Sequence, residues 1–317
     1  MLTLRVRSIK YEAEKIRSFE LVDPEGKDLP PFEAGAHIDV NVPGGFTRQY
    51  SLCNSPDDLS FYRIAVLEEL EGRGGSKSLH SQIRAGDLIT ISEPRNQFQL
   101  CNDAKHSILL AGGIGITPLL SMIKQLIIDN KSFELHYCTQ SLERTAFVSK
   151  LNELASNNVF YYHDGGNPKN GLDIANKLLE HKDGTHLYFC GPQGFMKAIK
   201  DASTHWPEES IHYEYFGADP ELAEKLAASS ANGANVRLAK SEKLISVEPG
   251  QSILAALRSS GVECSSSCES GLCGSCKVRY IEGSPVHNDF LLSEEERKSY
   301  VLVCCAGVGD QELLLDL

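Results

Sequence analysis

The sequence predicts a multidomain protein of the β and α/β classes, with three domains along the chain. Residues 1–102 show short runs of alternating apolar and polar residues, which favour an antiparallel β-barrel or sandwich. Residues 103–217 show apolar strands alternating with amphipathic helices, which favour a doubly wound parallel sheet. After a linker at 218–235, residues 236–317 contain six of the ten cysteines and are expected to form a small α+β domain around a cluster.

The expected strands of the first domain have an apolar residue at about every second position. They are LTLRVRSI, HIDVNV, YRIAVL and LITISEP, and turn signals such as PGG and GRGG separate them. This alternation is typical of strands with one buried face. The step Gly74–Gly75–Ser76 is expected to open a helix.

The expected strands of the second domain are apolar throughout: SILLAGG, FELHYC, VFYYHD and HLYFCGP. Helices are expected from Pro118 to about Asp129 and from Phe195 to Trp206. Ligands of doubly wound sheets bind at the carboxyl edge of the strands, where two of these runs end in glycine turns. Residues 218–235 have few large apolar side chains and therefore read as a linker.

Composition narrows the function classes. The net charge of -12 argues against nucleic-acid binding, because phosphate recognition needs a basic face. The acidity fits either plain solubility or docking to a basic protein. No apolar run is long enough to cross a bilayer, and the N-terminal MLTLRVRSIK lacks signal-peptide features. We therefore expect a cytoplasmic protein with reduced thiols.

Three cysteines lie close together in SSCESGLCGSCK: Cys268, Cys273 and Cys276. This spacing with a distant fourth cysteine is the plant-type pattern for a 2Fe-2S cluster, whereas structural zinc more usually has two close pairs. The fourth ligand must come from LVCCAG. Adjacent strand residues face opposite sides, so only one of the two can be a ligand, and Cys304 is favoured over Cys305.

Two glycine turns indicate a dinucleotide site. In LLAGGIGITP, an apolar strand runs through Gly112, Gly113 and Gly115 into a helix whose N-terminus would favour a pyrophosphate. It is not the GxGxxG fingerprint, and a purely structural turn remains an alternative. In LYFCGPQGFM, Cys190 ends a strand beside a glycine, either as a wall of a nicotinamide pocket or as a buried strand residue.

The first domain contributes the segment RQYSLCN. Arg48 is suited to hold a phosphate, Tyr50 to contact a ring system and Ser51 to donate to a polar ring atom. A structural role explains Arg48 and Tyr50 equally well when they are taken alone.

The order of six motifs along the chain favours a functional role over a structural one. The motifs are Arg-x-Tyr-Ser, Gly-Gly-Ser, GGIGITP, CGP, YFGA and the plant-type cysteine pattern. With them the chain resembles the phthalate dioxygenase reductase family, class IA reductases of Rieske oxygenases, and is also similar to the vanillate demethylase reductases. The resemblance covers nearly the whole length. It implies a flavin-binding barrel, an NAD-binding α/β domain and a C-terminal β-grasp-like plant-type ferredoxin domain.

The implied activity is that of an NADH-dependent flavin iron-sulfur oxidoreductase. Electrons would pass from NADH through FMN to the 2Fe-2S cluster, and on to a Rieske-type oxygenase or demethylase. The C-terminal position of the ferredoxin favours FMN over FAD. A different acceptor and a redox-sensing binding module are the alternatives, and a monomer is expected.

The resemblance also implies roles for single residues. The FMN phosphate would be held by Arg48, Ser76, Gly74 and Gly75. The flavin would be contacted by Tyr50, Ser51, Val66 and Thr117, and Phe216 would stack over it where nicotinamide enters. The nucleotide site would be lined by Gly113, Gly115, Cys190, Gly191 and Pro192. The expected catalytic residues are Ser51, Cys190 and Phe216, and the expected metal ligands are Cys268, Cys273, Cys276 and Cys304.

Two further features leave alternatives open. Asp164 is placed to bond an adenosine ribose, which favours NADH, whereas Arg144 is suited to a 2′-phosphate, which would favour NADPH. In SEEERKS, Ser293 and Glu296 have the spacing of a capping box. The charged helix that follows is either a solvated face or, with Asp289 and Glu282, an acidic docking surface.

Overall fold

The computed structural model describes residues 1–70, 74–216, 234–266, 271, 274–289, 291–309 and 312–317. The chain divides into two units, Met1–Phe216 and Gly217–Leu317, and each is described by itself. Among the described helices, none has the length and apolarity that a membrane crossing requires.

The first sheet is antiparallel, with strand order β4-β3-β6-β1-β2-β5. A bridge between Leu52, just after β4, and Ile64 of β5 joins its two edges. The sheet is therefore closed into a barrel, which is one of the two forms predicted from the sequence. Its elements are β1 (Leu2–Ala13), β2 (Ile16–Val22), β3 (His37–Val42), β4 (Phe46–Ser51), β5 (Tyr62–Leu67), β6 (Leu88–Ile91) and the helix α1 (Gly75–Gln82).

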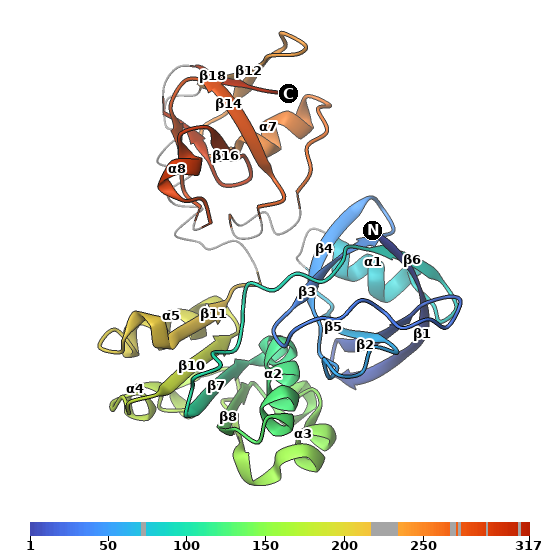
Figure 1. Ribbon diagram of the computed structural model, residues 1–317, viewed down its shortest axis with the longest axis vertical. Coiled ribbons are helices and arrows are strands. Elements are labelled where there is room, and N and C mark those ends of the chain that lie inside the picture. The colour runs from blue at the N-terminus through green and yellow to red at the C-terminus, as the bar shows by residue number, and fades with distance from the viewer. Residues whose placement is uncertain (71–73, 217–233, 267–270, 272–273, 290, 310–311) are drawn as a thin grey trace. The chain divides into compact units, whose positions relative to one another are not determined.

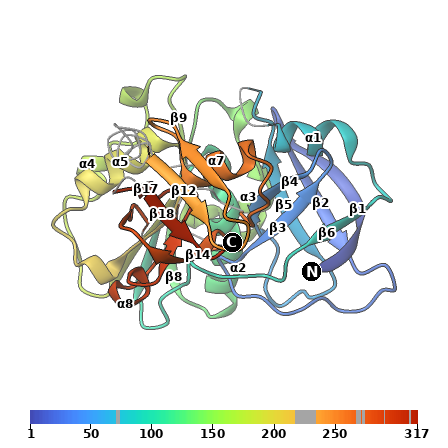
Figure 2. The ribbon, with the colours of Figure 1, turned by 90° about the horizontal axis from the view of Figure 1, so that it is seen from above.

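The alternating sequence explains this barrel. In β1, Leu4 and Val6 are buried and the residues between and beside them are exposed. They pack with Ile38 and Val40 of β3 in one apolar core. Burial of each such side chain contributes about 1.5–3 kcal/mol. Helix α1 contacts β3 and β4 and lies beside the barrel strands (Figure 1, Figure 2).

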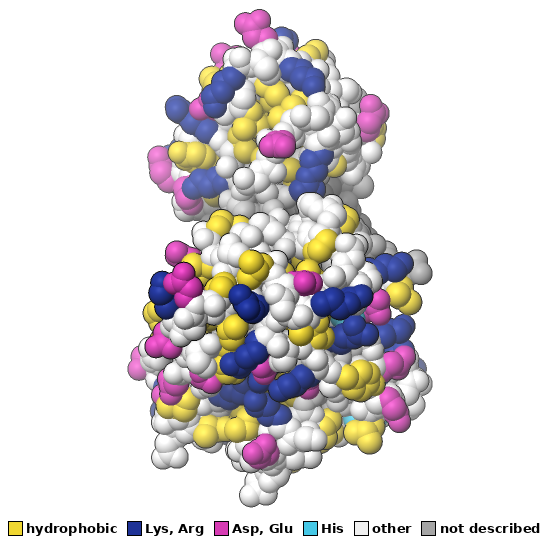
Figure 3. Space-filling view, turned by 90° about the vertical axis from the view of Figure 1, so that its right-hand side faces the viewer, with side chains coloured by type: hydrophobic (Ala, Val, Ile, Leu, Met, Phe, Trp, Pro, Cys, Tyr) yellow, Lys and Arg dark blue, Asp and Glu magenta, His cyan; other side chains and the backbone are white. Residues whose placement is uncertain are grey.

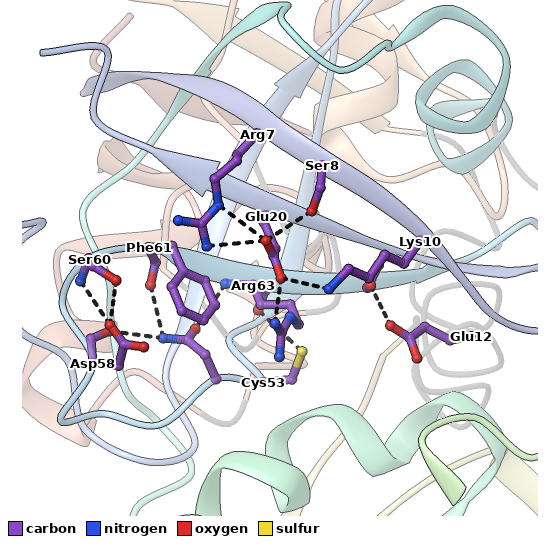
Figure 4. Close-up of polar contacts among 12 residues, drawn as sticks. Arg7, Ser8, Lys10, Glu12, Glu20, Cys53, Asp58, Ser60, Phe61 and Arg63 are labelled. Carbon is purple, nitrogen blue, oxygen red and sulfur yellow. Dashed lines mark hydrogen bonds and ion pairs between the residues drawn. The ribbon is translucent and has the colours of Figure 1, made fainter. Parts of the chain in front are cut away.

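An ionic cluster ties three neighbouring barrel strands together. Glu20 of β2 accepts hydrogen bonds from Arg7 at 3.1 Å, Ser8 at 2.9 Å and Lys10 at 3.4 Å on β1, and also from Arg63 on β5 (Figure 4). Burial raises the pKa of Glu20, but these partners, Arg63 first, lower it to about 2. The carboxylate is thus ionised across the physiological range.

The second sheet is parallel, with strand order β11-β10-β7-β8-β9. Helices α2 and α3 cover one face, and α4 and α5 cover the other (Figure 1). This confirms the predicted doubly wound sheet. Its elements are β7 (His106–Gly112), α2 (Ile116–Ile128), β8 (Ser132–Thr139), α3 (Val148–Ala155), β9 (Val159–His163), α4 (Ile174–Lys177), β10 (Thr185–Cys190), α5 (Gln193–Ala202) and β11 (Ile211–Glu214).

The barrel and the parallel sheet share packing within one unit. Ala13 and Ile16 of the barrel belong to the same apolar cluster as Leu119 and Met122 of α2. The buried ammonium of Lys124 on α2 also donates a hydrogen bond to the carbonyl of Cys53. The predicted boundary at 102/103 lies between β6 and β7, and the position of this boundary stays a prediction.

The second unit is built on a mixed five-stranded sheet, with strand order β13-β12-β18-β14-β16. Strands β12 and β18 are parallel, the other pairs are antiparallel, and α7 packs in the core of this unit. This agrees with the expected β-grasp-like domain. Its elements are β12 (Ala234–Leu238), β13 (Leu244–Val247), α7 (Ile253–Ser259), β14 (Lys277–Glu282), β15 (Pro285–Val286), α8 (Glu294–Arg297), β16 (Tyr300–Leu302), β17 (Gly307–Val308) and β18 (Glu312–Leu315).

The net charge of -12 is not spread evenly over the chain. Figure 3 shows Lys and Arg side chains gathered on one face of the N-terminal unit, with acidic side chains around them. The overall acidity is therefore a poor guide to the charge of any single surface.

Candidate functional site

The two glycine turns of the parallel sheet meet at its carboxyl edge. Strands β7 and β10 are neighbours, and Cys190 lies opposite Ala111. A Cβ atom on Gly115 would lie 2.1 Å from the carbonyl oxygen of Cys190. One on Gly112 would lie 2.7 Å from the ring of Pro192. Only glycine permits these contacts, so the structure brings the two separately predicted motifs together.

The first turn leads directly into α2. Gly113 has a φ of +54°, and a Cβ atom there would meet no atom within 4 Å, so its backbone is open to a ligand. Thr117 is buried, and its hydroxyl donates to the carbonyl of Ile114 at 3.0 Å. The short 3-10 helix η1 (Gly113–Gly115) also contacts β5, the strand that carries Val66. The predicted nucleotide turn and one predicted flavin strand are therefore neighbours.

Three strands place polar groups together beside this edge. The Ser51 hydroxyl of β4 donates to Oε2 of Glu214 at 3.2 Å. Glu214 ends β11 opposite Cys190, and its Oε1 lies 3.5 Å from Nδ1 of His37. Burial first, and Glu214 second, raise the pKa of the Cys190 thiol well above its usual value. The thiol is therefore neutral, and Cys190 presents an apolar side chain at this edge rather than a thiolate.

Glu214 is the residue that sequence reasoning missed. It stands two positions before Phe216, directly before the recognised motif YFGA. Its role is visible only in three dimensions, because its partner Ser51 is 163 residues away. Phe216 itself is 45% exposed, so its ring is available to cover a bound ligand.

The predicted phosphate site lies where α1 begins. Gly74 has a φ of +88° and precedes the helix, and the Ser76 hydroxyl accepts a hydrogen bond from the Glu69 N–H at 3.1 Å. A Cβ atom on Gly75 would lie 2.7 Å from Cγ of Arg48, so glycine makes room for the arginine stem. A guanidinium beside a helix N-terminus suits a phosphate. This donor set fits the terminal phosphate of FMN.

The predicted flavin contacts lie on β4 and β5. Tyr50 is half-buried, and burial raises the pKa of its phenol to about 12, against a smaller opposing effect of Arg48. It therefore stays protonated as a donor. Val66 is buried, and its carbonyl lies 2.9 Å from Nε2 of His80. An aromatic donor and an aliphatic wall fit the ring system of a flavin.

The two residues that bear on nucleotide choice differ in their contacts. Asp164 follows β9, and its Oδ1 accepts a hydrogen bond from the Gly166 N–H at 2.7 Å. Arg144 lies 3.0 Å from Glu14 in an ion pair. A 2′-phosphate at Arg144 would have to compete with this carboxylate.

Of the four predicted cluster ligands, Cys268 and Cys273 lie outside the described residues. Cys276 and Cys304 are both buried, and the Cys304 thiol interacts with the side chains of both Cys276 and Cys305. The adjacent Cys305, also buried, donates from its thiol to the carbonyl of Leu302 at 3.4 Å. Buried thiols from distant segments suit a shared cluster, and the choice of Cys304 over Cys305 stays a prediction.

The structure around helix α8 confirms one expectation for this segment and contradicts another. Its capping box is confirmed: the Glu296 N–H donates to the Ser293 hydroxyl, and Glu296 in turn accepts from the Ser293 N–H. Glu294 and Glu295 are exposed, and Glu282 is exposed as well. The inclusion of Asp289 in an acidic docking surface was wrong, because its side chain is only 1% exposed and pairs with Arg297.

Comparisons with known proteins bear on the whole chain. Residues 109–201 match an oxidoreductase NAD-binding domain, and residues 236–309 match a 2Fe-2S iron-sulfur cluster binding domain. The chain is 42% identical to a phthalate dioxygenase reductase of Burkholderia cepacia, over 100% of this chain and 97% of the relative. It is 39% identical to a vanillate O-demethylase oxidoreductase of a Pseudomonas species, over the full length of both.

This chain belongs to the phthalate dioxygenase reductase family. A solved phthalate dioxygenase reductase, described as a modular structure for electron transfer from pyridine nucleotides to [2Fe-2S], superimposes with a TM-score of 0.78. It is 42% identical, and the match covers 100% of this chain and 98% of that structure. The predicted family, the fold class and an oxidoreductase with NAD-binding and 2Fe-2S domains are thereby confirmed.

Proposed function

We propose that this member of the phthalate dioxygenase reductase family is the reductase component of a Rieske-type oxygenase or demethylase, and that it uses NADH, FMN and a 2Fe-2S cluster. One observation carries the proposal. Strands β4 and β5, the two glycine turns and Glu214 converge within one unit, and a cysteine-rich ferredoxin domain follows on the same chain.

The flavin site is proposed on the barrel. Arg48, Ser76, Gly74 and Gly75 would hold the phosphate at the start of α1, and Tyr50, Ser51, Val66 and Thr117 would surround the ring. A flavin bound there supplies exchange between a two-electron hydride donor and a one-electron acceptor. The chain's part is to orient: Ser51 is held by Glu214 at 3.2 Å, and Tyr50 remains a neutral donor.

The nucleotide site is proposed at the carboxyl edge of β7 and β10, with Gly113, Gly115, Cys190, Gly191 and Pro192 as its lining. Cys190 supplies a neutral, buried wall, and Phe216 an exposed ring that excludes water from the nicotinamide position. We favour NADH over NADPH, since Asp164 is available to a ribose hydroxyl and Arg144 is already paired with Glu14.

The cluster ligands are proposed to be Cys268, Cys273, Cys276 and Cys304. The named relatives serve a phthalate dioxygenase and a vanillate demethylase, so an oxygenase is the corresponding partner here. A Rieske centre in that partner, a monomeric reductase and a cytoplasmic location are the finer parts of the proposal. Cys53, Cys101, Cys138 and Cys190 are free cysteines, which is consistent with a reducing compartment.

The test begins with the isolated full-length protein. Iron, sulfide and flavin are measured per chain, and NADH is then titrated anaerobically while absorbance and low-temperature EPR are recorded. We expect bound FMN to bleach and a rhombic 2Fe-2S signal to appear. Zinc in place of iron, or flavin reduction without a cluster signal, would contradict the proposal.

A second measurement separates the alternatives for the acceptor. Sustained NADH oxidation with an added one-electron acceptor is expected of a reductase and not of a redox-sensing module. Reconstitution with purified oxygenase, haem-protein and diiron-hydroxylase acceptors then compares their reduction rates. Faster reduction of a haem or diiron protein than of any Rieske oxygenase would replace the proposed partner.

A further inference from the structure

The second unit contains a buried ionic group that the proposed electron relay does not use. Asp289 is in the segment between β15 and α8, and its side chain is 1% exposed. Arg297 of α8 donates from Nη2 to the Asp289 carbonyl at 2.8 Å and lies 3.4 Å from Oδ2. His287 Nδ1 lies 3.5 Å from the other oxygen, Oδ1.

Within the described part of the chain, this carboxylate is only partly hydrogen-bonded. Its Oδ2 accepts the Leu292 N–H at 2.8 Å, which holds the turn before α8. Its Oδ1 accepts no hydrogen bond from the described residues. Burial of a charge is costly unless it is paired and hydrogen-bonded, so the contacts of Asp289 with Arg297 and the Leu292 N–H stabilise its charged form.

Asp289 lies close to Gly271, a residue of the cysteine loop (residues 268–276). Gly271 lies between Cys268 and Cys273 and has a φ of +73°, which favours glycine. A Cβ atom on Gly271 would lie 3.2 Å from Cα of Asp289 and 2.8 Å from Sγ of Cys305. In addition, Asn288 donates from Nδ2 to the Cys305 carbonyl at 3.1 Å. Gly271, which lies between two proposed ligands in the sequence, therefore packs against the Asp289 backbone.

We infer that Asp289 and Arg297 are positioning residues of the cysteine loop whose opposed charges set the reduction potential of the 2Fe-2S cluster. This rests on the proposed ligand set. The potential of such clusters depends on net charge, hydrogen bonds and exposure. A buried negative charge disfavours addition of an electron nearby and lowers the potential, and a positive charge raises it.

The test uses two variants of the full-length protein. Asp289→Asn removes the negative charge and keeps an oxygen for the Leu292 N–H, and Arg297→Gln removes the positive charge. The midpoint potential is measured by redox titration followed by cluster EPR, with iron and sulfide determined per chain. We expect Asp289→Asn to raise the potential and Arg297→Gln to lower it, with the cluster retained in both.

Two matched controls separate charge from packing. Arg297→Lys keeps the positive charge, and Glu294→Gln removes an exposed charge from the same helix; both are expected to keep the wild-type potential. Loss of the cluster in both Asp289→Asn and Arg297→Gln would reduce the pair to a folding role and overturn the inference. Shifts in the same direction, or an unshifted potential with a full cluster, would also overturn it.

The two proposals fail in different ways. A wild-type protein without a rhombic 2Fe-2S signal would overturn the proposed function and its ligand set. A wild-type protein with that signal, together with variants whose potentials do not separate, would overturn only the role of Asp289 and Arg297.

Discussion

The N-terminal unit and the ferredoxin unit assemble their functional groups in opposite ways. In the first, Ser51, Cys190 and Glu214 come from three strands, and sheet topology brings them together. In the second, three of the four proposed ligands lie in the single stretch 268–276. A convergent site depends on close backbone packing between distant segments, whereas a local motif depends on the side chains of its own loop and on what supports that loop.

The largest expected effect follows from removal of Cys304, the one proposed cluster ligand that lies outside the stretch 268–276. Cys304→Ser is expected to abolish the 2Fe-2S signal and electron transfer to one-electron acceptors, while NADH still reduces the flavin at the wild-type rate. Iron content, EPR and stopped-flow absorbance measure the three properties. The matched control is Cys305→Ser, which should keep the cluster. Cluster loss in Cys305→Ser and retention in Cys304→Ser would reverse the assignment.

The convergent site is expected to be most sensitive at a glycine. Gly115→Ala places a Cβ atom 2.1 Å from the Cys190 carbonyl, and the backbone on both sides must shift. We expect a loss of about 3 kcal/mol in the free energy of unfolding and a strong fall in NADH-driven flavin reduction.

Gly194 of α5 provides the control, because a Cβ atom there would meet no atom within 4 Å. Gly194→Ala should stabilise the protein by at most about 1 kcal/mol, since alanine favours a helix. Urea denaturation and stopped-flow kinetics distinguish the two variants. Equal behaviour of both would show that contact between the turns does not build the site.

The same contrast explains what the sequence predicts well. Period-two alternation marked β1, β3, β5 and β6, and apolar runs marked β7 to β10, because these patterns reflect burial that any such sheet imposes. Helix α2 begins at Ile116 rather than at Pro118, since proline is tolerated throughout the first turn, where its missing N–H needs no partner.

What the sequence missed depends on distant partners. Glu214 reads as an ordinary strand carboxylate until Ser51 is placed beside it. Asp289 reads as part of a charged surface, because no local pattern shows that Arg297 and the Gly271 turn will bury it. Burial of a single charge is a property of tertiary packing, and sequence periodicity carries little information about it.

A smaller effect tests whether the convergent polar groups act as a unit. Ser51→Ala and Glu214→Gln are each expected to slow flavin reduction by NADH about tenfold, or about 1.4 kcal/mol in the barrier. Because the two side chains share one hydrogen bond, the double variant should be little slower than either single variant. Single-turnover rates measured anaerobically give the coupling. Multiplication of the two effects in the double variant would show that the residues act independently.

The smallest expected effect lies at the junction of barrel and parallel sheet, where Lys124 is buried against the Cys53 carbonyl. Burial lowers its pKa from 10.5 to about 8. Between these values the unfolded chain binds more protons than the folded chain, so stability rises with pH in this window.

Relative to a Lys124→Met variant, which lacks the titrating group, wild-type stability should therefore rise by about 1 kcal/mol between pH 7 and pH 9. Urea denaturation of both proteins across this range measures the difference, and the subtraction removes every group that titrates equally in the two. A difference that stays constant or falls with pH would mean that the ammonium is not destabilised at the junction. The charge on Lys124 would then remain at the junction of barrel and sheet without a cost in stability.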